Sequence, residues 1–174
     1  MVILENIEQH TILFEQFKLK WRFTEEKYNV LPPHHLEQIQ PLDKLASRLI
    51  SEVTDKMFSL RYQLNPDYFK FLEGYHLPET MEGEQLVKKW LYQRGLPFDH
   101  EVYVSWDSNT AAITTWKMIV KYWTDFDYGD DLVVVDKSLN WILVFFHYDY
   151  IQFGTNKERK EQICENEPVG TGSI

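Results

Sequence analysis

Four aspartates, Asp125, Asp127, Asp130 and Asp131, are crowded into one short segment of a 174-residue chain. Carboxylates placed so closely repel one another, and at the end of a helix they also oppose its dipole, which costs free energy and indicates a use. Three roles remain open: a divalent-cation site, a binding face for a basic protein, or a solvated turn. The spacing does not match an EF-hand, whose glycine and closing glutamate occupy other positions. We therefore predict no metal site and no cofactor.

Aromatic residues lie among and near these aspartates. The chain holds 6 Trp, 10 Tyr and 11 Phe, and such rings fill cores and also anchor protein interfaces. The formal net charge of −9 disfavours nucleic acid as a partner and favours a basic protein, although acidity also simply keeps a protein soluble. The predicted partner-binding residues are Asp125, Asp127, Tyr128, Asp130, Asp131 and Trp106.

Catalytic motifs are not found in the sequence. It contains no HExxH, CxxC, GxSxG, Walker or GxGxxG pattern. His147 precedes Asp149 at a predicted strand end, where the two could form an acid–base pair or a hydrogen-bonded strand terminus. His34 and His35 follow two prolines, which favours a solvated loop. We expect no catalytic residue and no enzymatic activity.

A helix over about 115–126 must position the aspartates. Trp116, Ile119, Val120 and Trp123 share one of its faces, and the hydroxyl of Thr114 or Thr115 is suited to cap it. A hairpin over 102–113 precedes it, and strands over 132–135, 141–146 and 150–153 follow. The connections are too short for crossovers, so the sheet is predicted to be antiparallel.

Four further elements are predicted in the N-terminal part of the chain. Alternating residues over Phe17–Phe23 favour an edge strand. A helix should begin at Pro41, with Leu42, Leu45, Leu49 and Val53 as its apolar stripe. Asn65 should start a short helix that ends at Gly74, and another helix should cover 81–94.

Length and composition predict one α+β domain over residues 1–160, in which N-terminal helices and the 115–126 helix pack on an antiparallel sheet. Residues 161–174, which include the single cysteine Cys164, should form a flexible polar tail. No signal peptide or membrane-length apolar run is visible, so we expect a cytoplasmic protein that does not bind membranes.

The C-terminal third carries several short motifs: a TTW before the helix, a W-x-x-F ending it, a DD before a strand, and a Trp-led strand running to F-G. Their residues are Thr114, Thr115, Trp116, Trp123, Phe126, Asp130, Asp131, Trp141, Asp149, Phe153 and Gly154. This pattern resembles small acidic bacterial immunity-type proteins of polymorphic toxin and contact-dependent inhibition systems.

The resemblance implies a stoichiometric binding protein that occludes the active site of a cognate basic toxin domain, such as a nuclease. Two alternatives remain open. One is a small ligand-binding domain or enzyme with an aromatic-lined pocket, and the other is a homodimeric structural subunit.

Overall fold

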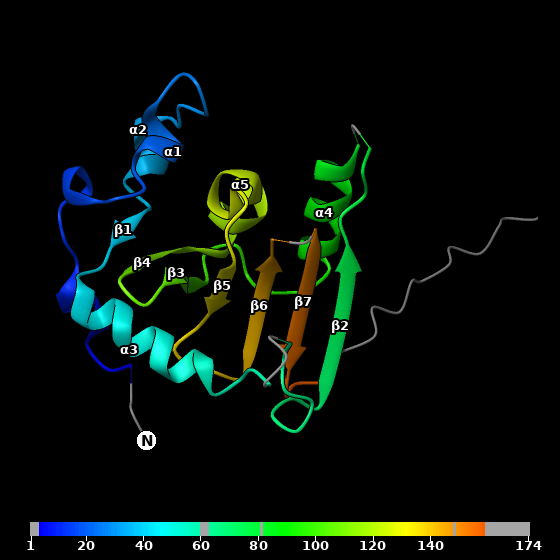
Figure 1. Cartoon of the computed structure of the whole chain (residues 1–174). Coiled ribbons are helices and arrows are strands. Elements are labelled where there is room, and N and C mark those ends of the chain that lie inside the picture. The colour runs from blue at the N-terminus through cyan, green and yellow to red at the C-terminus, as the bar shows by residue number, and fades with distance from the viewer. Residues whose placement is uncertain (1–3, 60–62, 81, 148, 159–174) are drawn as a thin grey trace, which may run out of the picture.

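The computed structural model describes residues 4–59, 63–80, 82–147 and 149–158. They form the predicted α+β fold, in which helices cover both faces of one antiparallel sheet (Figure 1). Across the sheet, the seven strands are β1 (Gln40–Pro41), β4 (Thr110–Thr115), β3 (Glu101–Asp107), β5 (Leu132–Val135), β6 (Trp141–Phe146), β7 (Tyr150–Thr155) and β2 (Phe71–His76). The predicted tail and Cys164 lie outside the described residues.

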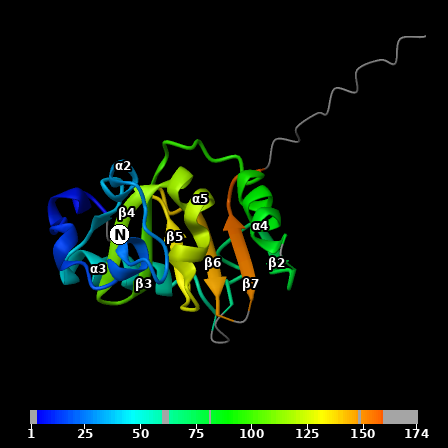
Figure 2. The ribbon, with the colours of Figure 1, turned by 90° about the horizontal axis from the view of Figure 1, so that it is seen from above.

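The helices fall on opposite sides of this sheet. They are α1 (Trp21–Thr24), α2 (Pro33–Leu36), α3 (Lys44–Asp55), α4 (Gly83–Tyr92) and α5 (Trp116–Asp127), with 3-10 turns η1 (Ile7–His10) and η2 (Phe14–Gln16). Helix α3 covers one face, and the other face carries α5 over the middle strands and α4 near β7 and β2 (Figures 1 and 2). The N-terminal helices α1 and α2 lie on the same side as α5.

Each face of the sheet has its own apolar core because side chains alternate along a strand. On β3, Val102 and Val104 pack toward α5, whereas Tyr103 between them packs toward α3. Strand β6 contributes to both cores, with Trp141 on the α5 side and Ile142 on the α3 side. The almost wholly apolar sequence of β6 follows from this two-sided burial.

Helix α5 confirms the helix predicted over about 115–126, but its connection differs from the prediction. Strands β4 and β5 both pair antiparallel with β3, one on each side, so they run parallel to each other. Helix α5 is therefore a crossover connection, and the prediction that the connections are too short for crossovers is wrong here. Its twelve residues are enough to carry the chain over β3.

The start of α5 is held by backbone groups of an earlier loop. Thr115 occupies the N-cap position, but its side chain makes no capping hydrogen bond, so the expected hydroxyl cap is wrong. The amides of Trp116 and Lys117 instead donate to the carbonyls of His100 at 2.8 Å and Phe98 at 2.9 Å. These bonds satisfy two of the amides that a helix leaves unpaired at its start.

Helix α3 is confirmed, although it begins at Lys44 rather than Pro41, which pairs in β1 instead. Asp43 is the N-cap, and its Oδ1 accepts from the Ala46 amide at 2.9 Å. Its Oδ2 also contacts His10 Nδ1 at 3.0 Å. The helix begins after Asp43 because this carboxylate pairs a free amide and favours the positive helix end, whereas Pro41 has no side-chain acceptor.

Two other predictions are wrong. Residues 17–23 form turns and α1 instead of an edge strand, because the burial alternation ends where Arg22 turns inward. The helix predicted from Asn65 to Gly74 is a turn followed by β2, which pairs with β7. Gly74 lies inside that strand, where a Cβ would meet the Tyr150 side chain, so it does not end a helix.

The predicted solvated loop at His34 and His35 is also wrong. Both residues lie in α2, and His35 is buried with Nδ1 at 2.5 Å from the hydroxyl of Tyr122 on α5. Tyr122 has non-helical angles, φ −122° and ψ 26°, so α5 is distorted where α2 contacts it. In the part of the chain that is described, no helix is long and apolar enough to cross a membrane.

Candidate functional site

The candidate site is built at the C-terminal end of α5, where the chain turns toward β5. Tyr128 follows the last helical residue and adopts a left-handed conformation, with φ 31° and ψ 39°. Glycine is the usual residue there, since a bulky side chain at positive φ is strained. Tyr128 is nevertheless 50% exposed, so burial does not account for its presence. A strained, exposed aromatic residue points to a role at the surface.

Two rings from the N-terminal region join Tyr128 to form a surface trio, Trp21, Tyr28 and Tyr128. The centroid of Trp21 lies 4.5 Å from that of Tyr28, and the centroid of Tyr128 lies 5.3 Å from Trp21 and 5.2 Å from Tyr28. Tyr128 meets both rings nearly edge-on, at 85° and 87°. Aromatic pairs favour this arrangement, so the rings support one another while remaining partly exposed.

Arg22 packs against two rings of the trio from the protein interior. Its side chain is buried, and its guanidinium carbon lies 5.2 Å from the Trp21 centroid and 5.6 Å from that of Tyr128. Nη1 donates to the Phe126 carbonyl at 3.0 Å, and Nη2 bonds the Asp130 carboxylate. One arginine therefore fixes α1, the last turn of α5 and the following turn together. Arginine suits this position because its planar fork both stacks and donates.

The four predicted aspartates lie together at this end of α5, with different partners. Asp130 pairs with Arg22, whereas Asp125 accepts from Asn29 Nδ2 at 3.1 Å. Asp131 accepts from the His147 amide at 2.9 Å and contacts Nδ1 of the same histidine at 2.7 Å. Asp127 is mostly buried, and its Oδ1 has no hydrogen-bond partner among the described residues. Among the described residues, Asp130 is the aspartate of this cluster that pairs with an arginine.

Asp127 and Asp125 are electrostatically unusual. Burial raises the pKa of Asp127 to about 7, Arg22 opposes this shift, and Asp130, Asp131 and Asp149 reinforce it. Burial also raises the pKa of Asp125, against the hydrogen bond from Asn29. The cluster thus carries less negative charge near neutral pH than a formal count of four carboxylates implies.

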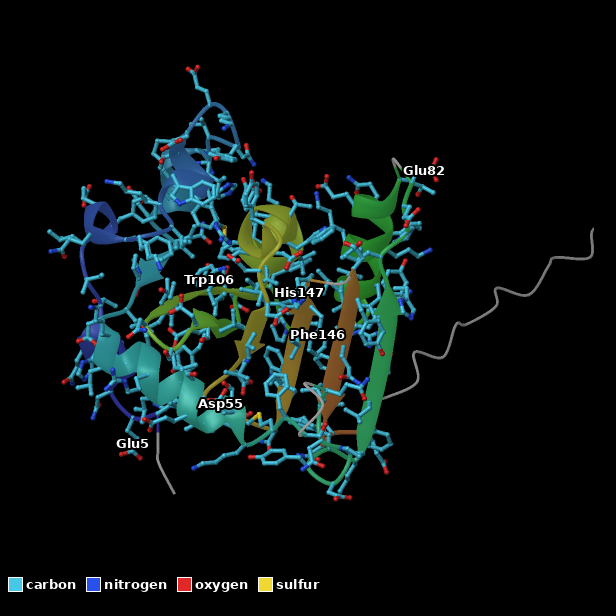
Figure 3. The ribbon with its side chains drawn as sticks, in the orientation of Figure 1. Glu5, Asp55, Glu82, Trp106, Phe146 and His147 are labelled. Carbon is cyan, nitrogen blue, oxygen red and sulfur yellow. The ribbon has the colours of Figure 1, made fainter. Side chains whose placement is uncertain are left out.

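Trp106 supports the site from inside the protein. Its ring stacks on Phe126 with centroids 6.1 Å apart, and Nε1 donates to the Phe126 carbonyl at 2.7 Å. The same carbonyl accepts from Arg22, so two side chains satisfy this unpaired group at the helix end. Figure 3 labels Trp106 together with His147, whose contact with Asp131 holds the turn after α5. Trp106 is half-buried, and its ring contacts point inward.

The alternative of an enzyme or ligand-binding domain predicts an aromatic-lined pocket and a role for His147. His147 contacts Asp131 through Nδ1. Two grooves, of about 480 and 410 Å³, lie beside η2, the first against β1 and the second against the start of β4, and neither is lined by Trp, Tyr or His147. Within the described ranges, no group of three or more His, Cys, Asp or Glu side chains is placed to hold a metal ion.

Trp21, Arg22 and Tyr28 belong to the site but were missed in the sequence. Arg22 alternates with apolar residues over Phe17–Phe23, a pattern that predicts an outward strand residue, and its contacts with the end of α5 span more than a hundred residues. The local signal was a Trp-Arg-Phe run shortly before Tyr28, in which a charge sits between two rings.

Comparison with family models, curated proteins and solved structures found no match.

Proposed function

We propose that this chain is a stoichiometric binding protein that docks a basic protein domain on the surface formed by Trp21, Tyr28 and Tyr128. The observation that carries the proposal is this partly exposed trio, set among carboxylates and held by a buried arginine. Binding energy at protein interfaces concentrates in Trp, Tyr and Arg residues. The trio is preorganised, so little side-chain entropy is lost on docking.

The surrounding charges suit a basic partner. Asp130 and Asp131 are exposed at the turn, and Glu25 and Glu26 are exposed in the segment that joins Trp21 to Tyr28. Exposed carboxylates around an apolar centre accelerate the approach of a cationic surface and have less effect on dissociation. In our proposal Tyr128, Trp21 and Tyr28 supply the anchors, while Trp106 supports them through Phe126.

The sequence resemblance to immunity-type proteins suggests which biological role this binding activity would serve. We propose an immunity protein that covers the active site or substrate groove of a cognate toxin, without itself acting as an enzyme. Such a mechanism needs one rigid, complementary surface per molecule and no catalytic group. A slow dissociation rate would come from the desolvated rings, and a fast association rate from the carboxylates.

The test is co-expression with the product of the neighbouring upstream gene. We expect relief of toxicity and a one-to-one complex by size-exclusion chromatography with light scattering. Replacing Tyr128→Gly should weaken binding at least tenfold, because it removes the ring, and glycine tolerates φ 31° without strain. Tyr92→Ala is the matched control, since Tyr92 is 61% exposed on α4. A free upstream product, with no toxicity relieved by this chain, would exclude the proposal.

A further inference from the structure

Asp127 lies at the base of the proposed surface, in a position that makes it sensitive to added positive charge. It directly precedes Tyr128, and it is mostly buried with Oδ1 unpaired among the described residues. Arg22 on α1 faces it, as do Asp130 and Asp131 in the following turn and Asp149 beyond β6. One fixed cation therefore stands against three further carboxylates, so the local formal charge is negative even when Asp127 is protonated and becomes more negative when it ionises.

We propose that Asp127 makes docking at the aromatic trio proton-linked: its buried, unpaired carboxyl group releases a proton when a cationic partner binds. This inference rests on the proposed function and specifies its regulation. Arg22 uses Nη1 and Nη2 on the Phe126 carbonyl and Asp130, and its buried Nε has no hydrogen-bond partner among the described residues, so Arg22 makes no direct bond to Asp127 there. A guanidinium or ammonium group from the partner would supply the missing positive charge.

The direction of the effect follows from linkage. The pKa of Asp127 is raised to about 7, chiefly by burial. In the free protein the Asp127 carboxyl group is therefore ionised in about a tenth of the molecules at pH 6 and in about nine-tenths at pH 8. A cation bound nearby lowers the pKa, and the equilibrium is reciprocal, so ionised Asp127 must bind the cation more tightly. Affinity should rise between pH 6 and pH 8, by up to about tenfold if the bound form is fully ionised.

His147 is the neighbouring group that could mimic this behaviour. It contacts Asp131 through Nδ1, and a protonated histidine would also repel a cationic partner at low pH. The two origins are separated by substituting each group alone. Asp127→Asn keeps the side-chain shape and removes the titration, whereas His147→Asn removes the imidazole charge and leaves Asp127 in place.

The experiment uses the full chain and a hexa-arginine peptide as the cationic probe, with calorimetry at pH 6, 7 and 8 and constant low ionic strength. Wild type should bind up to about tenfold more tightly at pH 8 than at pH 6. At pH 7, measurements in two buffers of different ionisation enthalpy should show about half a proton released per complex. Asp127→Asn should bind with nearly constant affinity, and His147→Asn should retain the rise.

Each other outcome contradicts a particular claim. A pH-independent affinity for wild type, or a rise that survives Asp127→Asn, overturns the role of Asp127 while leaving the docking surface standing. A rise abolished by His147→Asn alone assigns the effect to the histidine. If the peptide does not bind at any pH, or if Tyr128→Gly leaves its binding unchanged, the docking surface itself is wrong. Circular dichroism spectra of the variants establish that each is folded.

Discussion

At the scale of single residues, Asp136 shows how one buried carboxylate can hold several segments. It accepts from His100 Nε2 at 2.8 Å, from Trp141 Nε1 at 2.7 Å, and from the Ser138 hydroxyl at 2.6 Å. Burial raises its pKa, but the hydrogen bonds from Ser138, His100 and Trp141 together outweigh burial and leave the pKa lowered. The carboxylate therefore joins the turn after β5 to the starts of β3 and β6.

Asp136→Asn should destabilise the protein by about 2–3 kcal/mol at pH 7, because an amide places a donor among donors and loses the charge-assisted bonds. Since the folded pKa is lowered, this stabilisation is present above the unfolded value of 3.8 and is lost as pH falls through the folded value. Urea unfolding from pH 7 to pH 3 should show the two proteins converging. Asp99→Asn, at an exposed carboxylate, is the control. A constant gap across this range would contradict the assignment.

Asp127 should behave in the opposite way. Its folded pKa is raised from 3.8 to about 7, so the folded state binds more protons than the unfolded state between these values and loses stability as pH rises through them. Asp127→Asn removes this loss. Relative to wild type, the unfolding free energy of the variant should increase by about 1–3 kcal/mol from pH 4 to pH 8. This range is reduced to allow for the partial exposure of the carboxyl group.

Unfolding free energies at pH 4, 6 and 8 test the expectation for Asp127, with the difference between the two proteins as the measured quantity. Taking the difference cancels the titration of other groups. A wild-type stability that rises with pH relative to the variant would show that the carboxylate is stabilised by ionisation. That result would also remove the basis for proton-linked docking.

At the scale of secondary-structure elements, the paired strands β2 and β7 each contain a glycine that packs closely against another side chain, and the two neighbouring side chains differ. A Cβ on Gly154 would lie 2.8 Å from the Phe69 ring and 3.1 Å from Leu64, both of which are buried. A Cβ on Gly74 would meet the hydroxyl end of Tyr150, which is partly exposed and can swing away. The same substitution should therefore have unequal costs in two adjacent strands.

We expect Gly154→Ala to lower the unfolding free energy by about 1–3 kcal/mol, and Gly74→Ala to cost less than half of that. At both positions alanine reduces the conformational entropy of the unfolded chain by a similar amount. The difference between the two losses of unfolding free energy therefore reports side-chain packing. Thermal or urea unfolding of both variants supplies the comparison. Equal costs, or a greater cost at Gly74, would mean that Phe69 and Leu64 yield more easily than their burial indicates.

The elements that the sequence predicted correctly are those with strong local patterns. The hairpin around Asn109, the strands near 132–135, 141–146 and 150–153, and helices α3, α4 and α5 all carry either periodic apolar residues or a short, continuous apolar run. Strand β2 was missed because its half-exposed edge position leaves no clear alternation. Of the site, the aspartates and Tyr128 were found in one segment. Arg22 and the other two rings come from distant sequence, and only tertiary packing brings them to α5.

At the scale of the whole molecule, the two cores share strands and should unfold together. Adjacent residues of β3 and of β6 face opposite cores, so neither core can separate without breaking the sheet that supports the other. Trp116, Trp123 and Trp141 report on the core beneath α5, whereas far-ultraviolet circular dichroism reports on all elements. Fluorescence and circular dichroism should give coincident urea transitions. Transitions at distinct urea concentrations would show that the α3 side melts independently.

The position of β2 has a consequence for synthesis on the ribosome. This edge strand is synthesised early, yet its partner β7 is the last of the sheet's strands in the sequence. A nascent chain must carry β2 without its partner until nearly every other element has emerged, and strands awaiting distant partners are exposed to aggregation. Chaperone dependence during translation should therefore centre on this segment and decline once β7 has left the exit tunnel.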